Sequence, residues 1–97
     1  MTYSGKIVLV SLSGYVPERD EQFLRDLIAA RIELFCVICV GAREWENALD
    51  WACVNDEGLG EHTIVTTSHE HEPLAEVIGF AERFSTSAQH QSQVIHR

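Results

Sequence analysis

Residues 6–12 read Lys-Ile-Val-Leu-Val-Ser-Leu, and residues 34–40 read Leu-Phe-Cys-Val-Ile-Cys-Val. Both runs are apolar almost throughout, and each stops at a turn-forming sequence, Ser13-Gly14 after the first and Gly41 after the second. Strands with this pattern are buried on both faces, as in parallel sheets. A third, weaker strand is expected at residues 63–67, where the sequence is Thr-Ile-Val-Thr-Thr.

A helical pattern follows each of these three runs. Apolar residues spaced by three and four positions predict helices over residues 17–32, over residues 43–54 and from Pro73 to about Phe84. Three repeats of strand and helix, joined by right-handed crossovers, predict a small three-layer α/β domain. We expect a three-stranded parallel sheet in the order 2-1-3, like half of a Rossmann or flavodoxin fold. The domain is expected to span residues 1–84, and the polar residues 85–97 to form a flexible tail.

The composition restricts the classes of function. The chain has 97 residues and a formal net charge of −8, which argues against binding to nucleic acid or to anionic membranes. Its apolar runs are far shorter than the roughly 20 residues of a membrane span. Three cysteines in apolar surroundings indicate free thiols, and therefore a cytoplasmic protein. Cys36 and Cys39 have the Cys-x-x-Cys spacing, but within a strand they point to opposite faces, so we expect them to pack in the core.

Polar residues follow the predicted strands at the edge where open α/β sheets bind ligands. Ser11 and Ser13 follow the first strand and Arg43 follows the second. After the third strand come Thr67, Ser68 and His69. In a small-ligand or enzymatic site, Arg43 would bind an anionic group and His69 would transfer a proton. The alternative is that these residues only cap turns and helices, as Ser and Thr commonly do.

Several known site patterns are absent from the sequence. The turn after the first strand, Ser11-Leu12-Ser13-Gly14-Tyr15, has no lysine for a phosphate loop and only one of the three glycines of a dinucleotide site. No acid lies between Lys6 and Val16 to serve as a phosphorylated aspartate. The absence of a full catalytic motif favours a protein that is not an enzyme, and no organic cofactor is predicted.

Histidines and acids are close together in the second half of the chain. His69, His71 and Asp56 offer imidazole and carboxylate groups of the kind that bind zinc, nickel or copper. Their spacing matches no structural zinc pattern. A solvated acidic surface is therefore the alternative to a divalent-metal site.

The segment from Glu44 to Glu82 contains ten acids and neither lysine nor arginine. An acidic face of this kind steers association with a basic protein surface. A three-stranded sheet also has two unprotected edges, which predicts a homodimer. The leading hypothesis is a protein-interaction or regulatory module that uses this acidic surface. The small-ligand or enzymatic site and the metal site are the alternatives.

Three short stretches resemble a family of short stand-alone bacterial proteins of unknown function. They are Trp51-Ala52-Cys53, Thr66-Thr67-Ser68-His69-Glu70 and Glu72-Pro73-Leu74-Ala75-Glu76-Val77. The likeness extends from about Lys6 to Phe84. It implies a small cytosolic α/β domain, and it supplies no activity and no catalytic residue.

Overall fold

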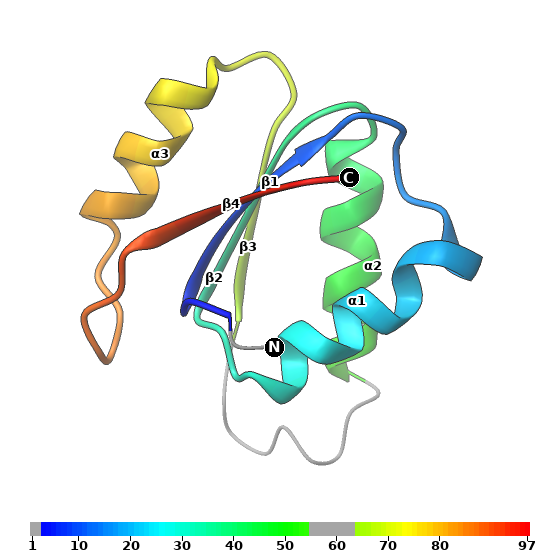
Figure 1. Cartoon of the computed structure of the whole chain (residues 1–97), viewed down its shortest axis with the longest axis horizontal. Coiled ribbons are helices and arrows are strands. Elements are labelled where there is room, and N and C mark those ends of the chain that lie inside the picture. The colour runs from blue at the N-terminus through cyan, green and yellow to red at the C-terminus, as the bar shows by residue number, and fades with distance from the viewer. Residues whose placement is uncertain (1–2, 55–63) are drawn as a thin grey trace.

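The computed structural model describes residues 3–54 and 64–97, which contain three helices and a four-stranded parallel sheet (Figure 1). The elements, in chain order, are β1 (Lys6–Ser11), α1 (Pro17–Ala29), β2 (Leu34–Cys39), α2 (Ala42–Val54), β3 (Val65–His69), α3 (Leu74–Arg83) and β4 (Ser92–His96). The strands lie in the order β3-β2-β1-β4, and every neighbouring pair is parallel.

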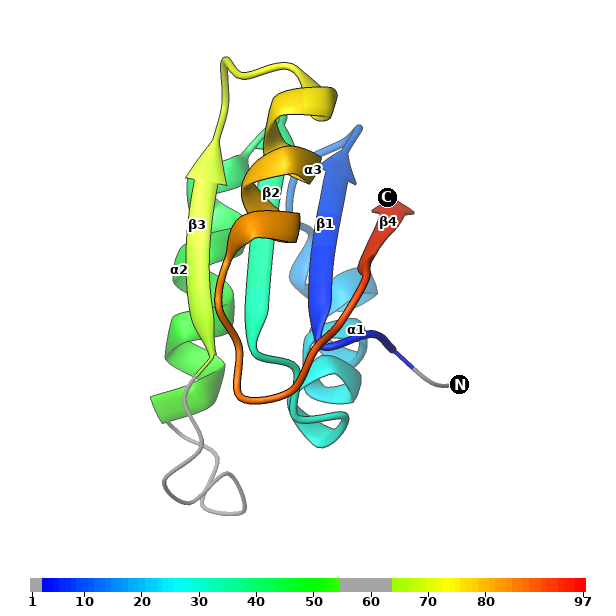
Figure 2. The ribbon, with the colours of Figure 1, turned by 90° about the vertical axis from the view of Figure 1, so that its left-hand side faces the viewer.

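This strand order explains the three layers. From β1 to β2 to β3 the chain moves in one direction across the sheet, so right-handed crossovers place α1 and α2 on the same face. From β3 to β4 the chain returns across β2 and β1, which places α3 on the opposite face. Figure 2 shows this arrangement, with α3 in front of the sheet and α1 and α2 behind it. The expected three-layer α/β architecture is therefore confirmed.

The expected strand order 2-1-3 is wrong. The third strand pairs with β2 and not with β1, so it lies at an edge of the sheet. The position beside β1 that the order 2-1-3 gave to the third strand is taken by β4. Both orders satisfy the handedness rule, which fixes the face of each helix but not the direction in which the chain moves.

The expected number of strands is also wrong, because residues 92–96 of the polar tail form β4. This strand pairs with β1 in register from Lys6↔Ser92 to Val10↔His96. The pairing continues beyond the strand, where Arg97 donates its backbone N–H to the carbonyl of Val10 at 3.0 Å. The last residues of the chain are therefore part of the sheet.

The sheet carries a hydrophobic cluster on each face. On one face Ile7 and Leu9 of β1 pack with residues of α1 and α2, including the fully buried Trp45. On the other face Val8 and Val10 pack with Val77 of α3 and its neighbours. β1 is thus buried on both sides, as its sequence predicts.

The three cysteines differ in their surroundings, and none of them forms a disulfide. Cys36 is buried in the cluster under α3, which confirms the expected core packing. Cys39 is exposed, so core packing is the wrong prediction there. Cys39 is the last residue of β2 and has a φ of 72°, which turns the chain out of the sheet.

No helix within residues 3–54 and 64–97 combines the length and the apolar character needed to cross a membrane.

Candidate functional site

The loop after β1 is held by Ser11, one of the residues expected to bind a ligand. The Ser11 side chain is completely buried. Its hydroxyl oxygen accepts hydrogen bonds from the indole N–H of Trp45 at 2.9 Å and from the backbone N–H of Gly14 at 3.1 Å. Ser11 therefore fastens this loop to α2 and does not face an open site.

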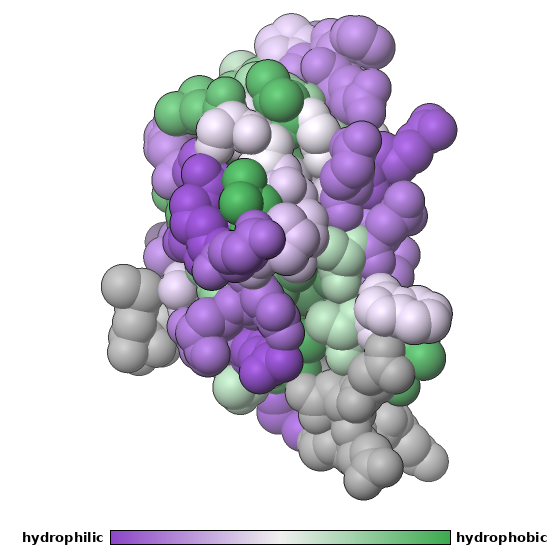
Figure 3. All heavy atoms as spheres, turned by 90° about the vertical axis from the view of Figure 1, so that its right-hand side faces the viewer, coloured by the Kyte–Doolittle hydropathy of each residue, from purple (hydrophilic) through white to green (hydrophobic). Residues whose placement is uncertain are grey.

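The loops after β1 and β2 touch each other. Gly41 has a φ of +67°, and a Cβ atom on it would lie 3.2 Å from the Cα of Gly14. Next to these glycines, Leu12 is 65% exposed and Val40 is 55% exposed. Figure 3 shows hydrophobic surface at the upper left of its view, below a hydrophilic top. At the place of the expected polar pocket, the two loops therefore lie close together and expose two apolar side chains.

An ion-pair network joins residues that follow β1 and β4 to the start of α1. Asp20 of α1 is fully buried, and its carboxylate accepts from the guanidinium of Arg19 at 2.6 Å and from that of Arg97 at 3.1 Å. Arg19 also donates to the hydroxyl of Ser13 at 2.7 Å. The guanidinium of Arg97 lies 4.3 Å from the ring centre of Phe23. Ser13 is thus part of a network that no local sequence pattern reveals, because its members lie up to 84 positions apart in the sequence.

The charge of Asp20 is stabilised by this network. Burial acts to raise the pKa of its carboxyl group, but hydrogen bonds from Arg19, from the backbone N–H of Val16 and from Arg97 outweigh burial, so the pKa lies below its ordinary value. A buried carboxylate that accepts four hydrogen bonds, three of them from guanidinium groups, forms a structural ion pair.

Thr67 and His69 are brought together, and Glu72 joins them. One ring nitrogen of His69, Nδ1, lies 3.0 Å from the carboxylate of Glu72, and the other, Nε2, lies 2.8 Å from the hydroxyl of Thr67. The order of hydroxyl, imidazole and carboxylate is that of a hydrolytic triad. Here, however, Thr67 lies beside Cys36 of β2, whose thiol pKa is raised by burial, and the imidazole lies 5.3 Å from the ring of Phe80. These contacts fasten β3 to β2 and α3.

The other predicted ligand-binding residues lie elsewhere. Ser68 pairs with Val37 in the face covered by α2, whereas Thr67 and His69 face α3. Arg43 is exposed in the first turn of α2. Of the predicted ligand-binding residues, only Thr67 and His69 therefore contact each other. The remaining four lie in other parts of the structure: Ser11, Ser13, Arg43 and Ser68.

The two histidines of the expected metal site have different surroundings. Both ring nitrogens of His69 are hydrogen-bonded, and His71 is exposed in the connection between β3 and α3. Asp56 lies outside the described residues. Among residues 3–54 and 64–97, no three His, Cys, Asp or Glu side chains are grouped closely enough to hold a metal ion.

The backbone of β3 forms an open edge of the sheet, defined here as the outward groups of residues 65–69. The N–H of Val65 donates inward to the carbonyl of Glu33 at 3.0 Å. Because backbone groups alternate along a strand, those of Thr66 and Ser68 point outward. No described residue pairs with this side of β3. The edge contains no proline and no lysine, two of the features by which proteins protect edge strands.

Carboxylates lie on both sides of this open edge. On the α2 face, Asp50 accepts a hydrogen bond from the hydroxyl of Thr66 at 2.8 Å. On the α3 face, Glu72 contacts His69, and its side chain is 51% exposed. The acids of α2 and those of the 70–82 region thus lie on opposite faces of the sheet, with β3 between them. They do not form the single acidic face that the sequence suggested. Asp50 and Glu72 belong to the predicted acidic segment, but only the strand order places them beside an edge.

Comparison with known proteins places the chain in a family. No curated protein and no solved structure matches it. A family model described as a domain of unknown function, DUF7684, matches residues 2–97. This match confirms the resemblance to an uncharacterised family of short proteins, while the bacterial origin stays a prediction. The chain belongs to the DUF7684 family.

Proposed function

We propose that this protein is a non-enzymatic protein-interaction module that binds an extended, basic segment of a partner protein at the open edge of β3. The observation that carries the proposal is the open edge itself, with the carboxylates of Asp50 and Glu72 on its two sides. Addition of a strand to an exposed sheet edge is a common mode of peptide recognition. Main-chain hydrogen bonds to Thr66 and Ser68 would provide affinity.

The charges beside the edge select the chemistry of the partner. Successive side chains of an added strand point to opposite faces, so a lysine on one face meets Asp50 and a lysine on the other meets Glu72. Val65, which is 38% exposed, offers an apolar contact at the start of the strand. We therefore expect the partner segment to carry basic residues on both faces.

A second copy of the chain suits this edge poorly. Pairing of β3 with β3 of another copy brings the same carboxylates close together, and like charges across an interface are unfavourable. The homodimer expected from the sequence is accordingly proposed to use a different surface.

The test uses a synthetic peptide, Thr-Lys-Val-Thr-Lys-Val, whose two lysines point to opposite faces when it is extended. Titration into the ¹⁵N-labelled protein should shift the amide signals of Thr66 and Ser68 more than those of β4. Binding should weaken as the salt concentration rises. A peptide with glutamate in place of lysine is the control. Absence of saturable shifts at β3, or equal binding of both peptides, would contradict the proposal.

Two sets of variants distinguish the contribution of backbone hydrogen bonds to binding from that of the charges. Ser68→Pro removes an outward N–H without breaking a bond to β2, and it should abolish binding, whereas Ser68→Ala should not. The double change Asp50→Asn with Glu72→Gln should weaken binding by about threefold to tenfold, as expected for two exposed ion pairs. Glu18→Gln with Glu21→Gln removes the same charge from α1 and should have little effect.

A further inference from the structure

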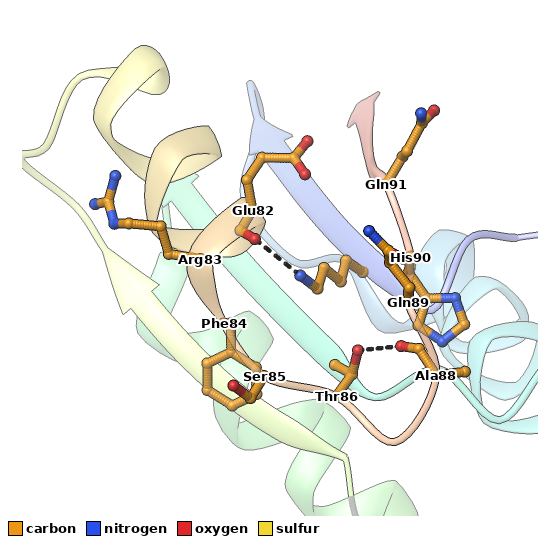
Figure 4. Close-up of a pocket in the computed structure, with 10 residues that line it drawn as sticks. Glu82, Arg83, Phe84, Ser85, Thr86, Ala88, Gln89, His90 and Gln91 are labelled. Carbon is orange, nitrogen blue, oxygen red and sulfur yellow. Dashed lines mark hydrogen bonds between the residues drawn. The ribbon is translucent and has the colours of Figure 1, made fainter.

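A hollow of about 740 Å³ lies at the opposite end of the sheet from the predicted ligand site. It is bounded by the start of β1, the end of α3 and the connection from α3 to β4 (Figure 4). Its lining is mostly polar and includes Lys6, Arg83, Ser85 and Thr86. We call it the Lys6 hollow. Its size lies within the range of small-molecule sites, about 300–1,000 Å³.

Lys6 is the reason to regard this hollow as a binding site. It is the only lysine of the sequence, and it is only 3% exposed. Its ammonium group has three donors, and one of them bonds to the backbone carbonyl of Glu82 at 3.3 Å. No other hydrogen bond of this ammonium group, and no ion pair, occurs within the described residues. A buried charge with so few partners is costly unless another group balances it.

The nearby acids are already committed to other partners. The carboxylate of Glu82 accepts from the hydroxyl of Ser92 at 2.7 Å, and these hydrogen bonds, more than the charge of Lys6, lower the pKa of Glu82. The carboxylate of Glu33 is held by Ser87 and by His90, whose ring nitrogen lies 2.8 Å away. Neither acid forms an ion pair with Lys6.

A purely structural role for Lys6 explains part of this geometry. A lysine that donates to a carbonyl at the end of α3 stabilises the negative end of the helix. That role uses one donor and an exposed lysine would fulfil it equally well. It does not account for burial of the ammonium group beside a polar hollow. Figure 4 shows His90 on one side of this hollow and the Arg83 side chain on the other, directed away from it.

We propose that the Lys6 hollow binds a small organic anion with hydroxyl groups, either a phosphate monoester or a hydroxycarboxylate. The ammonium group of Lys6 pairs with the anionic group. The side-chain oxygens of Ser85 and Thr86 bond to hydroxyl groups of the ligand. This site is independent of the open edge of β3, which lies across β2 from β1.

The single lysine makes a direct test possible. Protein labelled with ¹⁵N only at lysine gives one side-chain Nζ signal, which reports on Lys6 alone. Glycerol phosphate, malate and inorganic phosphate are titrated separately. We expect a saturable shift of this signal with glycerol phosphate or with malate. At ten times the dissociation constant, the unfolding temperature should rise by about 4–8 °C.

Two variants of equal charge complete the test. Lys6→Met keeps a similar shape without the charge, so it should fold and should lose the stabilisation by the anion. Arg43→Met removes one positive charge at the other end of the molecule and should keep that stabilisation. A response to phosphate esters alone assigns the site to phosphates, and a response to malate alone assigns it to carboxylates. The proposal is overturned if no probe shifts the Nζ signal saturably. It is also overturned if the anion raises the unfolding temperature of Lys6→Met as much as that of the unaltered protein.

Discussion

At the residue scale, Asp20 links the start of α1 to Arg97, 77 positions away in the sequence. Its carboxylate accepts a hydrogen bond of 2.9 Å from the backbone N–H of Val16, the residue just before α1. The same carboxylate holds Arg19 of α1 and Arg97 at the end of the chain. The Val16 side chain cannot accept a hydrogen bond from the first turn of α1. Asp20 supplies the reciprocal contact, in which an acid within the helix accepts the N–H of the residue before it.

Asp20→Asn should therefore lower the free energy of unfolding by about 2–3 kcal/mol at neutral pH, because hydrogen bonds between charged groups are replaced by weaker ones. Urea denaturation measures this change. Asp26→Asn is the matched control, since Asp26 lies on the same helix, is exposed and bonds to Gln22 at 2.9 Å. It should change stability by less than about 0.5 kcal/mol. Equal effects of the two substitutions would refute the importance of the network.

Ser11 shows what the sequence does not reveal about single residues. A serine just after a buried strand suits both a ligand site and a turn that needs a cap. Its bond to Trp45, 34 positions away, decides between them, and no local pattern contains that information. His69 was expected at a ligand site, and its partner Glu72 was expected only as one acid of the segment from Glu44 to Glu82.

At the element scale, the predictable elements are those with a strong apolar pattern. β1, β2, α1, α2 and α3 were each expected within a few residues of their observed bounds. β4 was missed because Ser92, Gln93 and His96 are polar and the strand lies at an edge, where burial is incomplete. Its conformation is imposed by pairing with β1 and not by local preference. The strand order was mispredicted for the related reason that it depends on which edge the later strands occupy.

Removal of residues 92–97 should accordingly prevent stable folding. The ladder between β4 and β1 joins five residue pairs. At about 1 kcal/mol for each hydrogen bond, its loss is comparable to the total stability of a small domain, about 5–15 kcal/mol. Circular dichroism should show a lost or strongly lowered thermal transition. Val94→Thr, a change at an exposed position of β4, should keep that transition. A cooperative transition of unchanged midpoint in the truncated chain would show that β4 is dispensable.

At the scale of the whole molecule, three carboxylates hold the C-terminal segment to the rest of the domain. Glu33, before β2, binds Ser87 and His90, while Glu82 of α3 binds Ser92 and Asp20 of α1 binds Arg97. Each of these carboxyl groups has a lowered pKa. For Glu33 the hydrogen bonds from the side chain and backbone of Ser87, with a smaller contribution from His90, lower the pKa from 4.5 to about 2.

This arrangement predicts that acid loosens β4 before the other strands. A carboxyl group whose pKa is lower in the folded state stabilises the fold above its ordinary pKa, and this stabilisation is lost as the pH falls toward the lowered value. For Glu33 the loss should therefore occur between about pH 4.5 and pH 2. Amide hydrogen exchange, expressed as protection factors, should show Arg97 losing protection at a higher pH than Val37 of the inner strand β2. Glu33→Gln should already weaken protection of β4 at pH 7 and reduce its further loss in acid. Simultaneous loss at Arg97 and Val37 would mean that acid unfolds the domain as one unit and that the three carboxylates do not control β4 separately.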